Sequence, residues 1–250
     1  MTAIFGYEVE NQLKEEFFGR SKRGFFVDVG ANDPVVGSQT WHLEQLGWDG
    51  VLVEPQRDLA EKLRQRRRAK VYPVACSSPA NSGKTMTLHL AGIQSSLKPD
   101  FFVPDMRPDG VSEVPISTLD EILTESNAPA PLDLVSIDVE THEIEVLNGF
   151  DLARWRPKLI LIEDIVLNLR LHRYLASKGY KWIRRTGLNG WYVPIDRTFR
   201  ISPLGRLQFF RKYYLGVPFR VARETLRPLR HRLNERWRNI QLKTRTNALD

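Results

Sequence analysis

Cysteine and long apolar runs are nearly absent from this sequence. Cys76 is the single cysteine among 250 residues, so no disulfide can form within the chain, and a reducing, cytoplasmic environment is expected. No run of about 18 consecutive apolar residues occurs, which argues against a membrane-spanning helix. Residues 1–8 lack the basic segment followed by an apolar segment that a secretory signal has, so no signal is expected.

Excess positive charge is confined to the end of the chain. Residues 197–250 hold 14 Lys and Arg against 3 Asp and Glu, whereas the preceding residues hold 23 basic and 27 acidic side chains. This asymmetry predicts an anionic partner for the terminal segment: a membrane surface, a nucleic acid or an acidic glycan. Aromatic residues adjoin the cations at 209–215, a mixture that favours a helix lying on an anionic membrane, at its inner face in a cytoplasmic protein.

Short apolar strands alternate with helical segments through most of the chain. We expect a helix in the first twenty residues, with Phe5, Val9, Leu13 and Phe17 facing the core. Strands are expected at 24–29, 51–53, 70–75, 132–137 and 158–162, with weaker signals at 85–90 and 113–116. A hairpin at 180–195, turning at Asn189-Gly190, closes the series. This order predicts an α/β fold whose mostly parallel sheet is covered by helices on both faces and ends in an antiparallel hairpin.

The phosphate-binding pattern G-x-G-x-x-G is missing after the first expected strand, where Asp28-Val29-Gly30-Ala31-Asn32-Asp33 stands instead. Gly30 and Ala31 are small enough for a ligand to approach the backbone. Asp28 and Asp33 would repel a pyrophosphate but suit a cationic cofactor that carries a sulfonium and an ammonium group. The turn therefore favours S-adenosylmethionine over NAD.

A carboxylate that could bind a ribose follows the second expected strand. Glu54 and Pro55 end that strand, 24 residues after Gly30, and a carboxylate there can accept both ribose hydroxyl protons of a nucleoside-type cofactor. Cys76 follows the third strand near the expected position of an adenine ring, either as a cofactor contact or as a small packing residue.

These motifs together resemble the FkbM family of methyltransferases. The matching stretches are F-V-D-V-G-A-N-D (26–33), G-V-L-V-E-P (50–55), V-P-I-S-T-L-D (114–120), L-D-L-V-S-I-D-V-E-T-H-E (132–143), V-L-N-G (146–149) and L-I-E (161–163). The resemblance implies a class I, Rossmann-like methyltransferase fold with a seven-stranded sheet. It also implies S-adenosylmethionine as cofactor and O-methylation of a sugar, polyketide or similar hydroxyl. From helical spacing, this resemblance and the charge distribution together, we expect an N-terminal helix over 1–23, the cofactor-binding methyltransferase domain over 24–196 and a basic, aromatic-rich helical tail over 197–250.

The sequence departs from the family at two positions. Pro34 and Thr141 stand where the family usually has glycine. Pro34 stiffens the turn after Asp33, and Thr141 is expected to cap the helix that begins near His142. Neither change removes a polar group, so activity is expected to be retained.

Acidic residues follow the fourth and fifth expected strands and supply the candidate catalytic groups. Asp138, Glu140 and His142 are the candidates for the base that takes the acceptor's proton, and Asp138 also lies at the expected cofactor edge. Alternatively Asp138, Glu163 and Asp164 bind a Mg²⁺ ion that lowers the pKa of the acceptor hydroxyl.

Two other classes of function fit the sequence less well. A nucleic-acid-binding protein would use the basic tail, but no Asn/Asp-Pro-Pro-Tyr motif follows the fourth strand, and acids stand there instead. An NAD-dependent oxidoreductase would need the glycines of the G-x-G-x-x-G pattern, and this sequence lacks them. The favoured acceptor is a sugar hydroxyl of a surface glycan or lipid-linked saccharide, with a small-molecule natural product as the alternative; the oligomeric state stays open.

Overall fold

The computed structural model describes residues 2–21, 23–92, 95–98, 108–164, 169–197 and 203–225. These residues belong to two compact units. The first unit comprises Met1–Ile165 and Arg170–Ser202, and the second comprises Val166–Leu169 and Pro203–Asp250.

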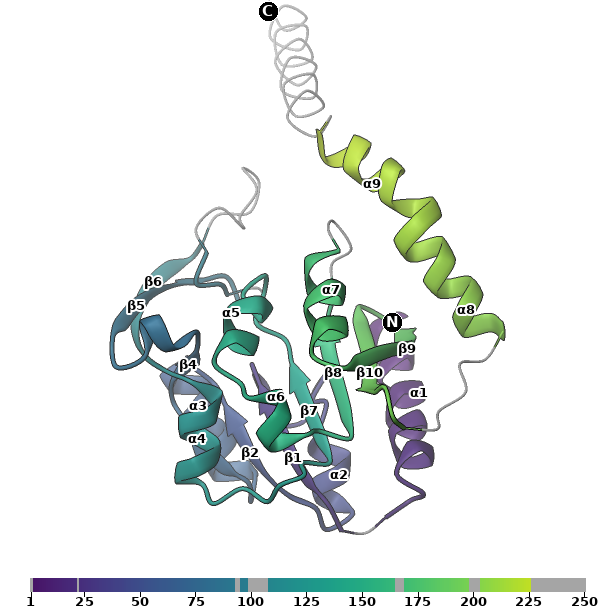
Figure 1. Ribbon diagram of the computed structural model, residues 1–250. Helices are drawn as coiled ribbons and strands as arrows, with labels where there is room; N and C mark the ends of the chain where they lie inside the picture. Colours follow the sequence, from purple (N-terminus) through teal and green to yellow (C-terminus); the bar gives the residue numbers. More distant parts are fainter. Residues whose placement is uncertain are drawn as a thin grey trace, which may run out of the picture. The chain divides into compact units, whose positions relative to one another are not determined.

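Strands and helices alternate along the first unit (Figure 1). Its helices are α1 (Thr2–Phe17), α2 (Trp41–Gln45), α3 (Arg57–Arg66), η1 (Pro79–Asn81), α4 (Leu119–Glu125), α5 (Glu143–Asn148), α6 (Leu152–Trp155) and α7 (Arg170–Ser177). Its strands are β1 (Phe25–Val29), β2 (Asp49–Val53), β3 (Lys70–Tyr72), β4 (Ala75–Cys76), β5 (Thr85–Leu90), β6 (Gly110–Ser117), β7 (Leu134–Ile137), β8 (Leu159–Glu163), β9 (Tyr180–Thr186) and β10 (Asn189–Pro194).

Seven of these strands form the main sheet, in the order β3-β2-β1-β7-β8-β10-β9. Strands β3, β2, β1, β7 and β8 run parallel to one another. Strand β10 pairs antiparallel with both β8 and β9. The predicted α/β fold is therefore confirmed as the Rossmann-like fold of class I methyltransferases. The strand order changes direction between β1 and β7, and such a switch point is where α/β sheets bind their ligands.

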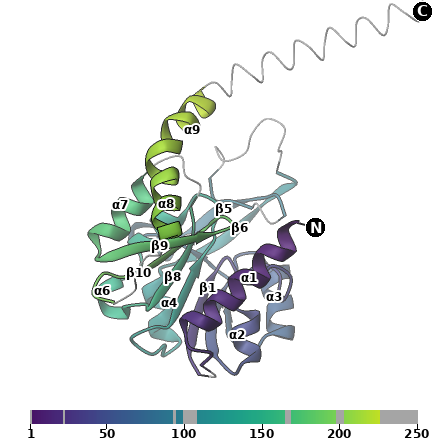
Figure 2. The same cartoon turned by 90° about the vertical axis from the view of Figure 1, so that its right-hand side faces the viewer.

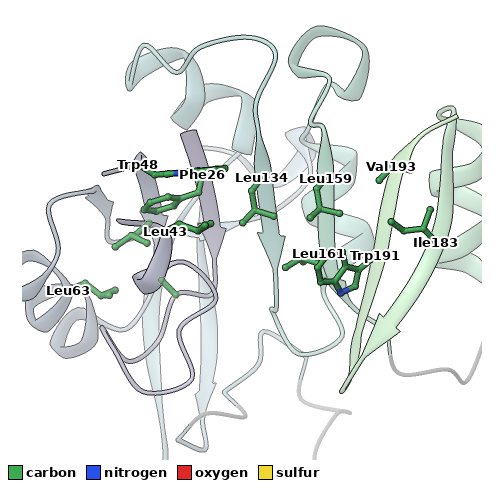
Figure 3. Close-up of a cluster of buried hydrophobic side chains, with 12 residues drawn as sticks. Phe26, Leu43, Trp48, Leu63, Leu134, Leu159, Leu161, Ile183, Trp191 and Val193 are labelled. Carbon is green, nitrogen blue, oxygen red and sulfur yellow. The ribbon is translucent and has the colours of Figure 1, made fainter. Parts of the chain in front are cut away.

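Helices cover both faces of the main sheet (Figure 2). Helices α1, α2 and α3 lie on one face, and α4, α6 and α7 lie on the other. On the first face Phe26, Leu134, Leu159 and Trp191 form one apolar layer that runs across the sheet (Figure 3). Each of these side chains is at most 1% exposed, and full burial of such a side chain stabilises the fold by about 1.5–3 kcal/mol.

Helix α1 joins this core with a different face from the one the sequence predicted. Leu13 and Phe17 pack against the core cluster, as predicted, but Val9 is 54% exposed. The buried positions beside them are Glu10 and Lys14, which lie one turn apart with Leu13 and Phe17 on the same helical face. Two charged side chains therefore point from α1 into the molecule.

The segment predicted as one strand at 70–75 divides between two sheets. Lys70–Tyr72 forms β3 at the edge of the main sheet. Ala75–Cys76 forms β4, which pairs with β6 in a separate sheet of order β4-β6-β5. Strand β5 pairs antiparallel with β6, so the two weak strand signals of the sequence are the two arms of this smaller sheet.

The terminal hairpin is confirmed, but its turn lies two residues earlier than predicted. Thr186 pairs with Asn189, which makes Gly187 and Leu188 the two turn residues. Gly187 has a φ of 52°, and a positive φ at the first turn position is what two-residue hairpins of type II′ require. Asn189 and Gly190 belong instead to β10, where both pair with β8.

The second unit is helical over its described residues. It contains α8 (Pro203–Phe210), a π-helical turn η3 (Arg211–Leu215) and α9 (Gly216–Thr225). The predicted tail beyond residue 225 lies outside the described part of the chain. Among the described helices of the protein, none is both long and apolar enough to cross a lipid bilayer.

Candidate functional site

Four carboxylates share one face of the main sheet at the carboxyl ends of its strands. Asp28, Glu54, Asp138 and Glu163 each lie two positions after a buried residue of β1, β2, β7 or β8. Because side chains alternate along a strand, all four point to the face that α1 covers. The cofactor is expected at the ends of β1 and β2, which we call the cofactor side. The methyl acceptor is expected at the ends of β7 and β8, which we call the acceptor side.

Gly30 sets the spacing between the two sides. It has a φ of 84°, and a Cβ added there would lie 1.9 Å from the backbone oxygen of Asp138. The backbone N–H groups of Gly30 and Ala31 both donate to Val53 O, at 2.9 and 3.1 Å. A glycine is therefore required at this position by the close approach of the two strand ends, in addition to any ligand contact.

Glu54 is held in place by two backbone N–H groups. Asn32 donates to Oε2 and Gln56 donates to Oε1, each at 2.9 Å. Burial raises the pKa of this carboxyl to about 7. Each oxygen keeps a further lone pair, so both can accept the hydroxyl protons of a ribose. Pro55 follows Glu54 and is half-buried.

Asp28 is tied to the turn after β1 by buried hydrogen bonds. Thr40 Oγ1 donates to Asp28 Oδ2 at 2.7 Å, and Arg67 donates to the same Thr40 oxygen at 3.0 Å. Arg67 also donates to Glu44 at 3.0 Å and to the backbone oxygen of Pro34 at 3.2 Å. Burial raises the pKa of Asp28 although Thr40 and Arg67 oppose that change. Through Thr40 and the backbone of Pro34, the guanidinium of Arg67 therefore fixes the turn that is predicted to bind the cofactor.

The structure places the other predicted cofactor residues in mainly structural roles. Asp33 Oδ1 accepts hydrogen bonds from the N–H groups of Val35 and Val36 at 2.9 and 2.8 Å, which lower its pKa. Asn32 has a φ of 50°, so it turns the chain while it binds Glu54. Cys76 is buried in β4, and burial raises the pKa of its thiol to about 12, so the group is neutral at physiological pH.

Two residues near this site were missed by the sequence analysis. Glu10 is 3% exposed and accepts hydrogen bonds from Thr186 Oγ1 and Asn189 Nδ2. Lys14 is fully buried and donates to the backbone and side-chain oxygens of Gln39. Burial lowers the pKa of Lys14 to about 8, opposed by the nearby carboxylates of Glu10 and Asp28. The available signal was a pair of charged residues four apart on the apolar face of the first helix.

Carboxylates gather on the acceptor side. One oxygen each of Asp138, Glu140 and Glu163 lies within 4.8 Å of the others. Asp164, which the sequence analysis included in its metal site in place of Glu140, points to the opposite face, where Oδ2 lies beside Gly190. Successive side chains alternate at the end of β8, so Glu163 and Asp164 cannot both face the same group.

Removal from water, followed by repulsion from neighbouring carboxylates, raises the pKa of every acid in this group. The pKa of Asp138 rises to about 6, because the protein atoms packed around its carboxyl group disfavour the charged form and the nearby Asp28 carboxylate repels it, although the residue is solvent-exposed at the end of β7. Burial is also the largest cause for Glu140 and Glu143, which both reach about 7. For Glu163, burial followed by Asp138 and Glu140 raises the pKa to about 9. A base with a pKa near 7 is well suited to take a proton at physiological pH.

The loop that carries Glu140 is strained and held from outside. Glu140 and Thr141 have φ values of 50° and 77°, a left-handed conformation that is costly for a β-branched residue such as threonine. Ser96 Oγ donates to Glu140 O at 2.8 Å, and Lys98 Nζ donates to Thr141 O. The expected helix cap by Thr141 is wrong: His142 is the N-cap of α5, and no side chain caps there.

His142, the third predicted catalytic residue, faces a different neighbour. Its Nε2 lies 3.0 Å from Ser77 Oγ, and both side chains are buried. Burial and the Lys98 cation lower its pKa, whereas Glu145 opposes that change. The His142 ring is therefore paired with Ser77, the residue that directly follows β4 of the smaller sheet. The role of His142 as a base stays a prediction.

Fold and site together define a class I methyltransferase: the sheet ends in an antiparallel hairpin, a ribose-type carboxylate ends β2, and acids replace the phosphate-binding glycines after β1. Residues 28–182 match the methyltransferase FkbM domain. The chain belongs to the FkbM family of S-adenosylmethionine-dependent methyltransferases.

Two solved structures are similar to this chain at low sequence identity. One is described as a "putative RNA methyltransferase", PH1948 from Pyrococcus horikoshii, with 10% identity over 73% of this chain and 84% of that chain and a TM-score of 0.36. The other is TrmK of M. capricolum in complex with S-adenosylhomocysteine, with 11% identity over 74% of this chain and 65% of that chain and a TM-score of 0.36. No curated protein matches the sequence significantly.

The residues on the cofactor side fit the chemistry of the family's cofactor. Glu54 has open lone pairs on both oxygens after it accepts two backbone N–H groups. The acids at 28 and 138 suit the positive sulfonium and ammonium groups. Glu54, Asp28 and the backbone at 30–32 are therefore the groups that would hold S-adenosylmethionine.

Proposed function

We propose that this methyltransferase acts on oxygen, transferring the methyl group of S-adenosylmethionine to a hydroxyl. The observation that carries the proposal is the group of acids with raised pKa on the acceptor side, directly beside the residues that fit the cofactor. A hydroxyl is a poor nucleophile until it loses its proton, so an O-methyltransferase needs a base at this place.

The proposed residues have distinct tasks in the reaction. The sulfonium group supplies an electrophilic methyl carbon. Asp138 or Glu140 takes the proton of the acceptor hydroxyl, whose oxygen forms the new C–O bond while the electron pair of the broken C–S bond returns to sulfur. Glu54 orients the cofactor through its ribose. Alignment of the acceptor oxygen with the methyl group contributes up to about 7–11 kcal/mol, and the base contributes about 10²–10⁴-fold.

Calorimetric titration with S-adenosylhomocysteine tests the cofactor assignment. Saturable binding to the full chain, reduced in Glu54→Gln, is expected. Binding of NADH without binding of S-adenosylhomocysteine would contradict it.

We propose a sugar hydroxyl, in a surface glycan or lipid-linked saccharide, as the acceptor; a small-molecule natural product is the alternative. The support is the family membership together with the basic, aromatic second unit. Transfer of labelled methyl groups from S-adenosylmethionine to fractionated glycan, lipid, metabolite and nucleic-acid extracts tests this. Label in the glycan or saccharide–lipid fraction is expected, and label only in nucleic acid would overturn it.

We further propose that the second unit contacts an anionic membrane. Its described residues 203–225 contain five Lys and Arg against one acid. Large apolar side chains on it are exposed: Leu207 60%, Phe210 49%, Tyr214 61% and Phe219 79%. Exposed apolar side chains interleaved with cations are typical of helices that lie on anionic lipid surfaces.

Vesicle sedimentation tests the membrane contact with the full chain. The wild type is expected to pellet with vesicles that contain phosphatidylserine and to stay in solution with neutral vesicles. Replacement of Leu207, Phe210 and Phe219 by serine is expected to abolish pelleting, because their apolar surface then no longer enters the lipid. Equal pelleting of both proteins, or tighter binding to a labelled RNA than to vesicles, would contradict the proposal.

The Mg²⁺ ion considered in the sequence analysis also stays a prediction. The sequence predicted Asp138, Glu163 and Asp164 as its ligands, and the structure groups Asp138 and Glu163 with Glu140 instead.

A further inference from the structure

We propose that Asp138, Glu140 and Glu163 form a binding site for one divalent cation of the hard, oxygen-liganded kind, such as Mg²⁺, Mn²⁺ or Ca²⁺. The three side chains come from the end of β7, the loop after it and the end of β8. Binding of the cation is independent of the proposed function, whereas a catalytic role for it rests on that function.

The spacing of the carboxylates fits one shared ion. One oxygen from each of the three residues lies within 4.8 Å of the other two. Two oxygens that bind an ion from opposite sides are separated by twice the metal–oxygen distance, about 4.2 Å for Mg²⁺ and about 4.8 Å for Ca²⁺. Three carboxylate oxygens at this spacing can therefore reach one ion with small side-chain adjustments, and water molecules would complete the coordination.

A second observation, independent of the spacing, concerns the hydrogen bonding of Glu163. The residue is 6% exposed, and its Oε2 has no hydrogen-bond partner among the described residues. Buried polar atoms in proteins are nearly always paired, because an unpaired one costs about 1–3 kcal/mol. The unpaired oxygen therefore lies on the same carboxylate that faces Asp138 and Glu140 in the group of three.

The surrounding charges also favour a cation. The carboxylates of Asp138, Glu140 and Glu143 all act on the Glu163 carboxyl, and the cation Arg185 opposes them. Three carboxylates gathered around a single point require positive charge or protonation to remain together. A divalent ion supplies two positive charges at that point, whereas one guanidinium supplies a single charge.

The strained loop keeps the middle ligand in place. Ser96, which is 1% exposed, donates to the backbone oxygen of Glu140, and Lys98 donates to the backbone oxygen of Thr141. Both contacts hold the left-handed backbone that turns Glu140 back toward the end of β8. If the proposed function holds, the acceptor oxygen would be a further ligand of the ion, and its hydroxyl would lose a proton more easily.

Titration of the full chain with Mn²⁺ tests the site, with free Mn²⁺ followed by electron paramagnetic resonance in the absence of cofactor and acceptor. We expect one Mn²⁺ per chain, displaced by excess Mg²⁺ or Ca²⁺. Glu163→Gln keeps the shape of the side chain and removes one charged ligand, so the affinity is expected to fall at least about tenfold. Thermal denaturation of the variant checks that the fold is retained.

Asp164→Asn is the matched control, because Asp164 is the neighbouring acid on the opposite face. It is expected to bind Mn²⁺ like the wild type, and Glu145→Gln, on α5 outside the group, serves the same purpose should Asp164→Asn lower the melting temperature. No saturable binding, equal binding in Glu163→Gln, or loss of binding only in Asp164→Asn would overturn the proposal. Titration of the same sample with S-adenosylhomocysteine shows separately whether the cofactor assignment holds.

Discussion

The cofactor side and the acceptor side of the sheet lie next to each other, but their carboxylates differ in the hydrogen bonds that they receive from the protein. On the cofactor side, Glu54 accepts two backbone N–H groups, and Asp28 accepts from Thr40, which Arg67 holds in turn. On the acceptor side, Glu163 keeps an unpaired buried oxygen, and Glu140 lies in a strained loop.

This difference indicates which part of the site is complete in the free protein. A carboxylate that is already bonded to the protein needs little reorganisation to bind a cofactor. The buried Glu163 carboxyl, in contrast, keeps an oxygen that no described residue satisfies, which costs stability until a ligand binds it. Substitutions on the cofactor side should therefore affect folding and cofactor affinity, whereas those on the acceptor side should affect the reaction.

The largest expected effect is a loss of the rate of methyl transfer, caused by a substitution on the acceptor side. Asp138→Asn is expected to lower the rate of methyl transfer by about 10²–10⁴-fold, because the amide cannot take a proton. The free energy of unfolding should stay equal or rise, since a crowded negative charge is removed. Initial rates of labelled-methyl transfer and urea denaturation measure the two quantities. Asp196→Asn, an exposed acid paired with Arg156, is the control, and equal losses of rate in both variants would sink the assignment.

The largest expected loss of stability is on the cofactor side. Arg67→Met leaves the buried carboxylate of Glu44 without its partner at 3.0 Å, and breaking a buried ion pair costs about 3–5 kcal/mol. Urea denaturation measures the loss. Arg64→Met, where the side chain is 45% exposed in a surface pair, should change stability by less than about 0.5 kcal/mol. A loss below about 1 kcal/mol for Arg67→Met would show that the cofactor side is not held as described.

A third prediction concerns cofactor affinity and pH. Burial raises the pKa of Glu54 to about 7 in the free protein, so its proton must leave before both oxygens can accept ribose hydroxyls. The affinity for S-adenosylhomocysteine should therefore rise about tenfold from pH 6 to pH 8. The same raised pKa means that Glu54 itself stabilises the fold below pH 4.5 and loses that contribution as the pH rises through 7.

Calorimetry at several pH values, on the wild type and on Glu54→Gln, measures this dependence. The variant should bind more weakly, by about 10–150-fold for one lost charged hydrogen bond. It should also lose the pH dependence, which separates Glu54 from the neighbouring Asp28 and Asp138. An unchanged pH profile in the variant would assign the effect to one of those acids.

The smallest expected effect sharpens the description of the strained loop. Thr141→Gly should raise the free energy of unfolding by about 0.5–1 kcal/mol, because relief of the left-handed strain exceeds the added flexibility of glycine. Thr141→Ala keeps a Cβ and should show no gain. Thermal denaturation compares the two variants, and equal stability of both would mean that the backbone is not strained at Thr141.

Much of the fold could be predicted from the sequence because its strands are short apolar runs separated by clear turns. The order of strands, the terminal hairpin and the position of Glu54 follow from such local patterns. The division of 70–75 between two sheets could not be predicted, because β4 is defined by its partner β6, some forty residues later. The hairpin turn was misplaced because Asn189-Gly190 is a stronger local turn signal than Gly187-Leu188.

The candidate site was predicted in part for the same reason. Residues at strand ends, such as Asp28 and Asp138, are marked by their position after an apolar run. Glu10 and Lys14 are not, since they reach the site from a distant helix whose inward face looked apolar in the sequence. The grouping of Glu140 with Glu163, rather than of Asp164 with Glu163, depends on a left-handed backbone at Glu140 that no residue type there suggests.

The pairing of β4 with β6 has a consequence for how such a protein can diverge. Ala75 pairs with Ile116 and Cys76 with Ser117, so the chain leaves the main sheet after β3 and returns to α4 through two stems fixed side by side. We call residues 77–115, which connect these two parallel strand segments, the cassette. Its length and sequence can change during evolution without a shift in the register of the main sheet, and through Ser96 and Lys98 the cassette reaches the acceptor side. We therefore expect that exchange of this cassette between relatives changes the proposed acceptor side and leaves the strands of the main sheet in register.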